Sequence, residues 1–544
     1  MQYVTSNGGK DVPLAADVSE FQVEMRDGVS LYTHLTLPAG TKTCPLVFVR
    51  NPYVGKDSAI QAHCDYNYSL LKNGYGIVLQ HCRGCGLSGG DCIPYVNERN
   101  DGLDTLDWIR GLSCYAGEIY LSGGSYLSSV HFSYLDTVPP DVKGAVLPVQ
   151  DVDRYNILYR NGFFKCGLHG GWFIGMYKKN SMPKKNYVED SFRMLPLSRF
   201  SETVFGENVP AFDEPLRHPD REDPFWKTPA GGSDYFHALT KLRIPVLLVT
   251  AFHDLYTEGI FRMWDSLPAE NRKNCAMIVT PYSHGFNGPE VLNFESGCLS
   301  TQWPDFTLNW FNSIRTGEPL RFAKRGMTTY YSLFDGAWRS EPFLKPGPEK
   351  MEFFLNDRTL DPKAGENGEI TYVYNPAAPA SFKGGCCNNF GGMQIQDPPN
   401  SRYDIVSYLS EPFGESVLAG GPMSLGLHVR SDRPDTCFYA RLSLVRENVA
   451  YGLRDDILSL TYGKSEAYEP GRETVLQFHF AEHSFRIGRG DRIRLDISSS
   501  CWPYFVPHTN RAGLFSEQTG ADIAHNTIIR GKSKLVLHVS QMKD

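Results

Sequence analysis

Hydrophobic and polar residues alternate in two neighbouring segments near the start of the chain, residues 20–25 and 29–35. Asp27-Gly28 stands between them, and this dipeptide favours the tight turn of a β-hairpin. The apolar residues of segment 101–110 recur at helical spacing. Short apolar runs typical of buried strands occur at residues 45–50, 76–80, 118–122, 145–149, 246–250 and 276–280. Strands that alternate with helices in this way predict a parallel α/β sheet.

The pattern changes twice further along the chain. Residues 150–235 are rich in aromatics, Gly and Lys and show little strand pattern, which predicts a helical cap inserted into the sheet domain. Beyond residue 346, short alternating segments separated by turn residues predict an all-β sandwich or jelly roll. The domains expected are 1–148 (first part of the core), 149–236 (cap), 237–345 (second part of the core) and 346–544 (β-domain).

Length and charge narrow the class of protein. A chain of 544 residues exceeds the ~250–300 that one hydrophobic core supports, so two or three domains are expected. The net charge is −7 and no Lys/Arg run is longer than two residues, which argues against nucleic-acid binding. The N-terminal residues form no apolar signal segment, and no apolar stretch is long enough to span a membrane. We therefore expect a cytoplasmic protein that acts on small molecules, and a homodimer is compatible with the sequence.

The segment Gly123-Gly124-Ser125-Tyr126-Leu127 follows a predicted strand and precedes a helical stretch. A nucleophile elbow requires this context, because a glycine two residues before the serine lets the chain turn sharply and leaves the hydroxyl exposed. The last position of the G-x-S-x-G pattern is Leu127 instead of glycine. The motif alone therefore fits both a nucleophile and an ordinary Gly/Ser-rich turn.

Two residues that could activate this serine follow it in the chain. Asp254 comes just after the strand at 246–250, and His284 just after the strand at 276–280. The order serine, acid, histidine is that of the α/β-hydrolases, and open α/β sheets carry their sites at the carboxyl ends of strands. These residues predict a Ser125–His284–Asp254 triad.

Competing residues fit less well. His253 precedes the acid, His81 precedes the serine, and Asp265 fits an exposed position of a helix. His81 with Cys82, Cys85 and Cys92 suggests zinc, but a single CxxC lacks the second ligand pair of structural zinc sites. The 13 cysteines are expected to be reduced, and no metal or organic cofactor is needed.

An oxyanion hole requires two hydrogen-bond donors aimed at the developing charge. The backbone N–H of Tyr126 follows the nucleophile and supplies the first. The loop after the strand at 45–50 should supply the second, and it carries Arg50-Asn51-Pro52-Tyr53. The phenol of Tyr53 is a candidate donor, with a buried structural tyrosine as the alternative.

Several of these segments resemble one family. The matching motifs are Arg50-Asn51-Pro52-Tyr53, Gln80-His81-Cys82-Arg83-Gly84, Gly123-Gly124-Ser125-Tyr126-Leu127, Ile244-Pro245-Val246 with Asp254, Pro281-Tyr282-Ser283-His284, Gly488–Leu495, Ser498-Ser499-Ser500 and Trp502-Pro503. Together they resemble the cocaine esterase/X-Pro dipeptidyl-peptidase superfamily, the CocE/NonD hydrolases. The resemblance implies an α/β-hydrolase core with an inserted helical cap and a C-terminal jelly roll. It also implies that Tyr53 is the side-chain oxyanion donor beside the Tyr126 amide.

The chain departs from that family at two positions. His81 stands where the family usually has Asp, and Ser128 stands where it usually has glycine. We expect His81 to be structural, holding Arg83 and the nearby loop in a changed local network. Ser128 is small enough to fit.

The family contains esterases, α-amino-acid ester hydrolases, β-lactam side-chain acylases and X-Pro dipeptidases. Members that take a free α-amine place acidic residues directly after the triad aspartate, where this chain has Leu255-Tyr256-Thr257. Asp151 and Asp153 could still supply negative charge. The resemblance therefore favours a small carboxylic ester or amide with an uncharged acyl group, with the amine-binding activities as alternatives. A non-enzymatic alternative is an inactive protein whose jelly roll binds carbohydrate.

Aromatic residues of the cap and neighbouring loops are candidates for the substrate pocket, although each would equally suit the cap's own core. They are Phe163, Phe164, Trp172, Phe173, Phe252 and, from the β-domain, Phe390.

Overall fold

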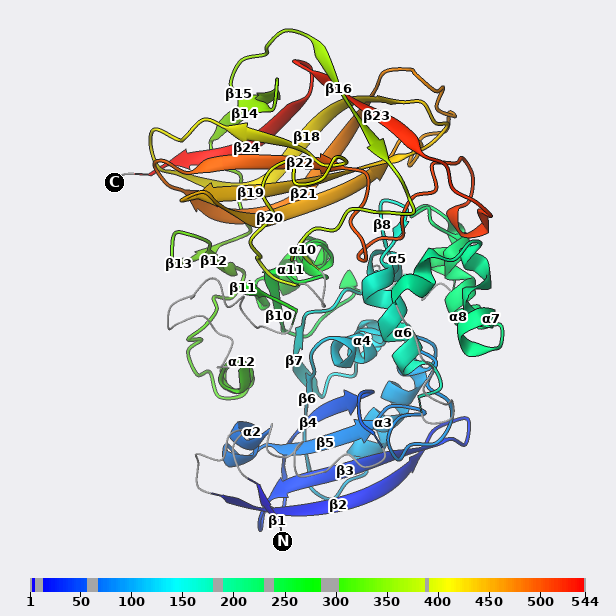
Figure 1. Cartoon of the computed structure of the whole chain (residues 1–544). Helices are drawn as coiled ribbons and strands as arrows, with labels where there is room; N and C mark the ends of the chain where they lie inside the picture. The colour runs from blue at the N-terminus through cyan, green and yellow to red at the C-terminus, as the bar shows by residue number, and fades with distance from the viewer. Residues whose placement is uncertain are drawn as a thin grey trace.

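The computed structural model describes residues 2–4, 13–55, 67–179, 189–228, 239–284, 303–386 and 391–542. Two large β-sheets dominate it, one N-terminal and one C-terminal, with a group of short helices beside them (Figure 1). This is the predicted α/β-hydrolase core with an inserted helical cap and a C-terminal jelly roll. The expected domain boundaries themselves remain predictions.

The N-terminal sheet has the order β1-β2-β3-β5-β4-β6-β7-β10-β11-β12-β13. Neighbours from β5 to β12 pair in parallel, as the alternation of strands and helices predicts, whereas the strands at both edges are antiparallel. The Asp27-Gly28 hairpin joins β2 to β3, and Gly28 has φ +83°. The strands are β1 (Gln2–Val4), β2 (Leu14–Glu24), β3 (Ser30–Pro38), β4 (Cys44–Asn51), β5 (Gly76–His81), β6 (Tyr115–Ser122), β7 (Val142–Pro148), β10 (Val246–His253), β11 (Ala276–Ser283), β12 (Thr328–Ser332) and β13 (Ala337–Glu341).

Helices cover both faces of this sheet because its central strands are apolar on both sides. Val47 and Val49 of β4 pack toward α2 and α12, while Leu46 and Phe48 pack toward α3, α4 and α10. The helices are α2 (Tyr68–Lys72), α3 (Glu98–Arg110), α4 (Tyr126–Phe132), α10 (Thr257–Ser266), α11 (Ala269–Arg272) and α12 (Trp303–Arg315).

The segment between β7 and β10 carries short helices and one small hairpin. Figure 1 shows these helices beside α4. Its aromatic side chains pack on one another: Phe200 stacks on Phe192 with ring centres 4.4 Å apart, and Phe212 lies against both. The elements are α5 (Arg154–Leu158), β8 (Tyr159–Arg160), β9 (Phe163–Phe164), α6 (Gly171–Met176), α7 (Phe200–Phe205) and α8 (Pro210–Asp213).

The C-terminal sheet has the order β16-β23-β18-β24-β14-β15-β17-β22-β19-β20, with β21 paired to β18. Alternation at 351–355, 370–374, 423–429, 440–445, 475–480, 492–498 and 534–539 predicts β14, β16, β18, β19, β21, β22 and β24. It did not predict β15, β17, β20 or β23. β20 escaped prediction because its central residues, among them Arg454, Asp455 and Asp456, are buried without alternation. The strands are β14 (Glu349–Leu355), β15 (Thr359–Asp361), β16 (Gly368–Tyr374), β17 (Val406–Ser410), β18 (Val417–Ser431), β19 (Cys437–Arg446), β20 (Val449–Ser459), β21 (Thr474–Ile487), β22 (Arg492–Ser498), β23 (Ala524–Arg530) and β24 (Lys534–Gln541).

Contacts of several kinds join the β-domain to the other two parts. The Arg160 guanidinium of the cap pairs with Glu258 of α10 and, at 3.1 Å, with Asp455 of β20. Phe252 of β10 stacks on His483 of β21 with ring centres 4.4 Å apart. Among the described helices, none is long and apolar enough to cross a membrane.

Candidate active site

Ser125 lies between the end of β6 and the first residue of α4. Its φ of +57° is in the left-handed region, which non-glycine residues seldom adopt outside strained or functional turns. A Cβ at Gly123 would stand only 2.6 Å from the Leu127 Cβ, so this position requires glycine. Steric crowding therefore explains why the first position of the motif is glycine. Leu127 at the last position does not prevent the turn.

The Ser128 side chain stabilises the turn that carries Ser125. Its hydroxyl is buried and lies within hydrogen-bonding reach of two carbonyl oxygens, that of Gly123 and, at 2.9 Å, that of Pro148 at the end of β7. The small residue thus fits, as expected, and it also links the two strands on which the turn rests.

His284 connects the other two residues of the predicted triad. Its Nδ1 lies 2.7 Å from Asp254 Oδ2, and its Nε2 lies 2.9 Å from Ser125 Oγ. An ionised carboxylate can only accept, so Nδ1 carries the proton and Nε2 presents its lone pair to the serine hydroxyl. The structure therefore brings the three residues together in the geometry that proton removal from Ser125 requires.

The Asp254 carboxylate is fully buried and its orientation is set by its neighbours. Its Oδ1 accepts a 2.7 Å hydrogen bond from the Tyr256 amide, which leaves Oδ2 for the imidazole. The Thr257 hydroxyl bonds to the carbonyls of Ala251 and Asp254 and holds the loop between β10 and α10. The aspartate is thus fixed before any substrate binds.

Tyr53 projects from the loop after β4 toward Ser125. Its hydroxyl accepts a 3.3 Å hydrogen bond from the Trp172 indole. Burial of that hydroxyl raises the pKa of Tyr53, and hydrogen bonding with Ser125, Trp172 and the Tyr126 amide opposes the rise. The residue as a whole is 41% exposed, whereas its hydroxyl is shielded enough for burial to dominate its pKa. The Asn51 carboxamide and the Lys179 ammonium bind the Tyr53 backbone and hold this loop.

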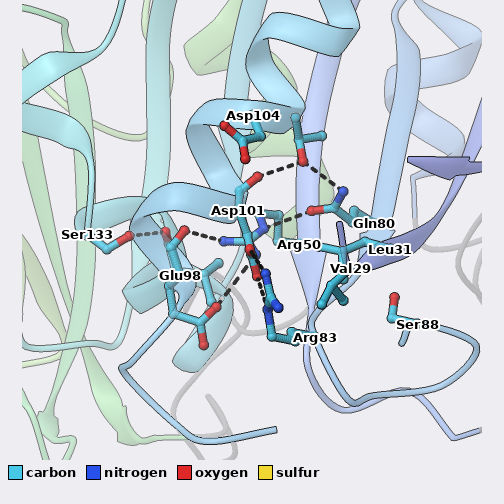
Figure 2. Close-up of polar contacts among 12 residues, drawn as sticks. Val29, Leu31, Arg50, Gln80, Arg83, Ser88, Glu98, Asp101, Asp104 and Ser133 are labelled. Atoms are coloured by element: carbon cyan, nitrogen blue, oxygen red, sulfur yellow. Dashed lines mark hydrogen bonds and ion pairs between the residues drawn. The ribbon is translucent and has the colours of Figure 1, made fainter. Parts of the chain in front are cut away.

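A buried network of charges surrounds Arg50 (Figure 2). Arg50 donates to the Glu98 carbonyl at 2.8 Å and to Gln80 at 3.0 Å. The network reaches the residue after Ser125, because the Tyr126 phenol donates to Glu98 at 2.7 Å. Arg83 binds Asp101 through two hydrogen bonds of 2.6 and 3.1 Å. Burial raises the pKa of Glu98, while Arg50 and the Tyr126 hydroxyl oppose the rise. Two arginines and two carboxylates thus balance one another under α4.

The cavity above Ser125 has a volume of about 350 Å³. Aromatic and neutral polar side chains line it, and no carboxylate lies among the described lining residues. Burial, followed by Arg154 and Lys165, lowers the pKa of His169 well below its usual range, so this imidazole is neutral. The lining residues are Tyr53, Tyr95, Ser125, Tyr126, Gln150, His169, Trp172, Tyr256 and His284.

Of the aromatic residues expected in the pocket, the structure brings only Trp172 to this cavity among those it describes. Phe163 and Phe164 line a separate cavity of about 520 Å³ between cap and β-domain. Phe173 is buried against Tyr177, and Phe252 is covered by His483. These four expectations are not met because the cap and β-domain need the same side chains for their own packing. Phe390 lies outside the described residues.

Asp151 and Asp153 are likewise engaged elsewhere. Asp151 accepts from the Asp153 amide at 2.9 Å and from the Asn156 carboxamide at 3.1 Å, and it borders a different cavity. Asp153 pairs with Arg221 at 2.6 Å. The two carboxylates therefore add no negative charge to the wall of the cavity above Ser125.

The competing histidines have structural roles. His253 is 1% exposed, its Nε2 faces the Gly452 carbonyl at 3.3 Å, and burial beside Arg454 lowers its pKa to about 3. His81 holds its loop as expected, because its Nδ1 accepts from the Leu87 amide at 3.2 Å. Arg83, however, pairs with Asp101 and Asp27 rather than with His81. Within the described chain, no three His, Cys, Asp or Glu side chains converge as a metal site would require.

Sequence reasoning missed four lining residues: Tyr95, Gln150, His169 and Tyr256. Tyr256, two residues after Asp254, and Gln150, two after the end of β7, could have been found from their places at strand ends. Tyr95 and His169 carry no such signal because they reach the site from irregular segments.

The fold and the site together define an α/β-hydrolase with an inserted cap and a C-terminal jelly roll. The family model of X-Pro dipeptidyl-peptidase (S15 family) matches residues 27–286, and that of the X-Pro dipeptidyl-peptidase C-terminal non-catalytic domain matches residues 321–535. The chain therefore belongs to the cocaine esterase/X-Pro dipeptidyl-peptidase superfamily, a family of serine hydrolases.

Individual relatives match this chain over nearly its whole length. Cocaine esterase from Rhodococcus sp. (strain MB1 Bresler) is 24% identical over 560 residues, covering 94% of this chain and 96% of its own. Among solved structures, an α-amino acid ester hydrolase has a TM-score of 0.83 at 18% identity, covering 98% of both chains. An aminopeptidase from a marine sediment Thaumarchaeota archaeon has a TM-score of 0.80 at 17% identity, covering 97% of both. These two structures share the fold of this chain.

Proposed function

We propose that this protein is a serine hydrolase that cleaves small carboxylic esters, with Ser125 as nucleophile, His284 as general base and acid, and Asp254 as the residue that orients the imidazole. The observation that carries the proposal is the position of His284, with one ring nitrogen 2.9 Å from Ser125 Oγ and the other 2.7 Å from Asp254. No metal or cofactor takes part in this mechanism.

The reaction proceeds by acyl transfer in two steps. Ser125 Oγ attacks the ester carbonyl while His284 Nε2 takes its proton, and the Tyr53 hydroxyl and Tyr126 amide hydrogen-bond the oxyanion. The C–O bond to the alcohol then breaks, and the imidazolium returns the proton to the leaving oxygen. Water, deprotonated by His284, then attacks the acyl-enzyme. The bond between the acyl carbon and Ser125 Oγ breaks, His284 returns the proton to Oγ, and the carboxylic acid leaves.

An uncharged acyl group fits best, because no carboxylate lies among the described residues that line the cavity. An ammonium group entering it would lose hydration without gaining a counter-ion, and such uncompensated burial of charge is costly. This supports an esterase more than an X-Pro dipeptidyl-peptidase, an α-amino-acid ester hydrolase or a β-lactam acylase.

Replacement of the nucleophile tests the proposal. Ser125→Ala should abolish hydrolysis of p-nitrophenyl esters and covalent labelling by a fluorophosphonate. Ser129→Ala, one helical turn further along α4, is the matched control and should retain both. Labelling and turnover of Ser125→Ala at the parental rate would overturn the assignment.

A substrate comparison tests the preference for uncharged acyl groups. Phenyl acetate should be hydrolysed much faster than an X-Pro anilide or the phenyl ester of an α-amino acid. A preference for either aminated substrate would replace the esterase proposal by the corresponding alternative. A folded protein that neither labels nor hydrolyses any of them would support the inactive binding protein.

A further inference from the structure

Tyr95 forms one wall of the cavity above Ser125 and is held in a single orientation. Its amide donates a 2.6 Å hydrogen bond to the Tyr126 hydroxyl, and its ring meets the Tyr126 ring edge-on with centres 4.9 Å apart. The Arg154 guanidinium lies 4.2 Å from the centre of the Tyr95 ring. Tyr95 also has φ +71°, a conformation that is rare for a bulky side chain and marks a position the surrounding structure enforces.

The Gln150 side chain is the hydrogen-bonding neighbour of the Tyr95 hydroxyl among the described residues. Burial raises the pKa of Tyr95, while Arg154 and the Gln150 side chain oppose the rise. A tyrosine hydroxyl beside a carboxamide can accept a hydrogen bond and still donate its own proton. Since Tyr95 lines the cavity, a substrate oxygen can accept that proton.

Gln150 adds a second donor at the same place. Its side chain is 1% exposed and lines the cavity, and within the described chain its Nε2 makes no hydrogen bond of proper geometry. Val149, directly before it, has φ +50°, which a β-branched residue adopts only under constraint. Because an unpaired buried amide costs free energy, a ligand that supplies an acceptor regains it.

The charges of the cavity wall select among ligands. No carboxylate lies among the described residues that line the cavity. A cationic substrate group at Tyr95 would therefore lose hydration without gaining a counter-ion from these residues, which is costly. A neutral oxygen acceptor incurs no such cost.

We propose that Tyr95 and Gln150 form a subsite that hydrogen-bonds an oxygen atom of the substrate, such as an ether, carbonyl or hydroxyl oxygen, and rejects an ammonium group in its place. This inference rests on the proposed function, because it concerns esters that Ser125 hydrolyses. It narrows the substrate class from small uncharged esters to small esters with an additional oxygen acceptor. A site with buried donors discriminates against analogues that lack the acceptor, because such analogues leave the donors unpaired.

Isosteric ester pairs test the subsite. On the acyl side, p-nitrophenyl methoxyacetate is compared with the butanoate and the 3-methoxypropanoate with the pentanoate; on the alcohol side, 2-methoxyethyl acetate is compared with butyl acetate. The ether-to-alkyl ratio of kcat/KM is measured for the parent, Tyr95→Phe and Gln150→Met. Comparing these ratios between enzymes cancels the intrinsic reactivity of each ester.

We expect the ratio to fall by about tenfold in both variants for at least one pair, since that is the worth of an ordinary hydrogen bond. Tyr372→Phe, whose hydroxyl bonds Ser499 in the β-domain, is the control and should leave every ratio unchanged. Ratios within about twofold of the parent for all pairs in both variants would overturn the subsite. If Tyr95→Phe does not fold, Gln150→Met alone decides.

Fluorophosphonate labelling separates this inference from the proposed function. A parent enzyme that labels and hydrolyses the alkyl esters, with unchanged ratios in the variants, contradicts the subsite alone. A folded parent that neither labels nor hydrolyses any ester contradicts the proposed function, and the subsite with it.

Discussion

The phenol of Tyr126 donates a 2.7 Å hydrogen bond to the buried carboxylate of Glu98. The same tyrosine follows Ser125 directly and carries the amide assigned to the oxyanion hole. The position of this amide therefore depends on a charge network that touches neither substrate nor nucleophile, with Arg50 holding the Glu98 carbonyl at 2.8 Å.

Tyr126→Phe should consequently lower kcat by about tenfold and leave KM within about twofold, because a displaced amide loses part of the oxyanion stabilisation that one donor provides. Affinity for an aryl boronic acid, which mimics the tetrahedral intermediate, should fall in parallel. Glu98→Gln, which keeps an acceptor for the phenol, should be milder. The control Tyr372→Phe removes a buried hydroxyl far from the site and should change neither parameter. If Tyr126→Phe lowers the thermal stability but leaves kcat and boronic acid affinity unchanged, Glu98 has no positioning role.

Tyr53→Phe tests the side-chain oxyanion donor. It removes one hydroxyl and keeps the ring, so kcat should fall by roughly 10²–10³ with little change in KM. The measurement is steady-state hydrolysis of an activated ester by enzyme titrated with fluorophosphonate. An unchanged kcat would assign the Tyr53 hydroxyl a structural role as acceptor for Trp172.

The two glycines before Ser125 should respond differently to a methyl group. A Cβ at Gly123 would stand 2.6 Å from the Leu127 Cβ, whereas one at Gly124 would stand 3.5 Å from Pro148 Cγ, an ordinary contact. Gly123→Ala should therefore cost about 1–3 kcal/mol of stability, as overpacking does, and displace the nucleophile. Gly124→Ala should be close to neutral in stability. Chemical denaturation and labelling rates measure both effects, and equal behaviour of the two variants would rule out the steric explanation.

His253 makes stability depend on pH with a definite sign. Burial lowers its pKa to about 3, so the folded state holds this imidazole neutral while the unfolded chain protonates it near pH ~6.5. The contribution to stability is thus fully present above pH ~6.5 and is lost as the pH falls toward 3, at about 1.4 kcal/mol per pH unit.

His253→Gln should flatten this loss, by about 2 kcal/mol between pH ~6.5 and ~5. The free energy of unfolding by urea at a series of pH values measures it. His525, on the surface of the β-domain with its side chain 55% exposed, supplies the control variant His525→Gln. An identical slope in His253→Gln and the parent would contradict the buried, neutral state of His253.

Local pattern was enough to predict the α/β-hydrolase core and the C-terminal all-β domain, and it also supplied the candidate triad residues. Ser125, Asp254 and His284 each follow a strand, and the carboxyl ends of parallel strands necessarily lie at one edge of a sheet. A hydrophobic period of two residues marks a strand and one of 3.6 residues marks a helix, and each is visible within a short segment. The order of these segments along the chain can also be read from the sequence, without knowledge of distant contacts.

Tertiary structure decided which of the other side chains line the cavity above Ser125. Phe173 and Phe252 are as apolar as a pocket residue should be, yet Tyr177 and His483 cover them, whereas Tyr95 and Gln150 reach the cavity instead. An aromatic side chain buries apolar surface whether it packs in a core or lines a pocket, so the residue type alone cannot distinguish the two positions. Only the packing of the cap and β-domain on the sheet determines which side chains face Ser125.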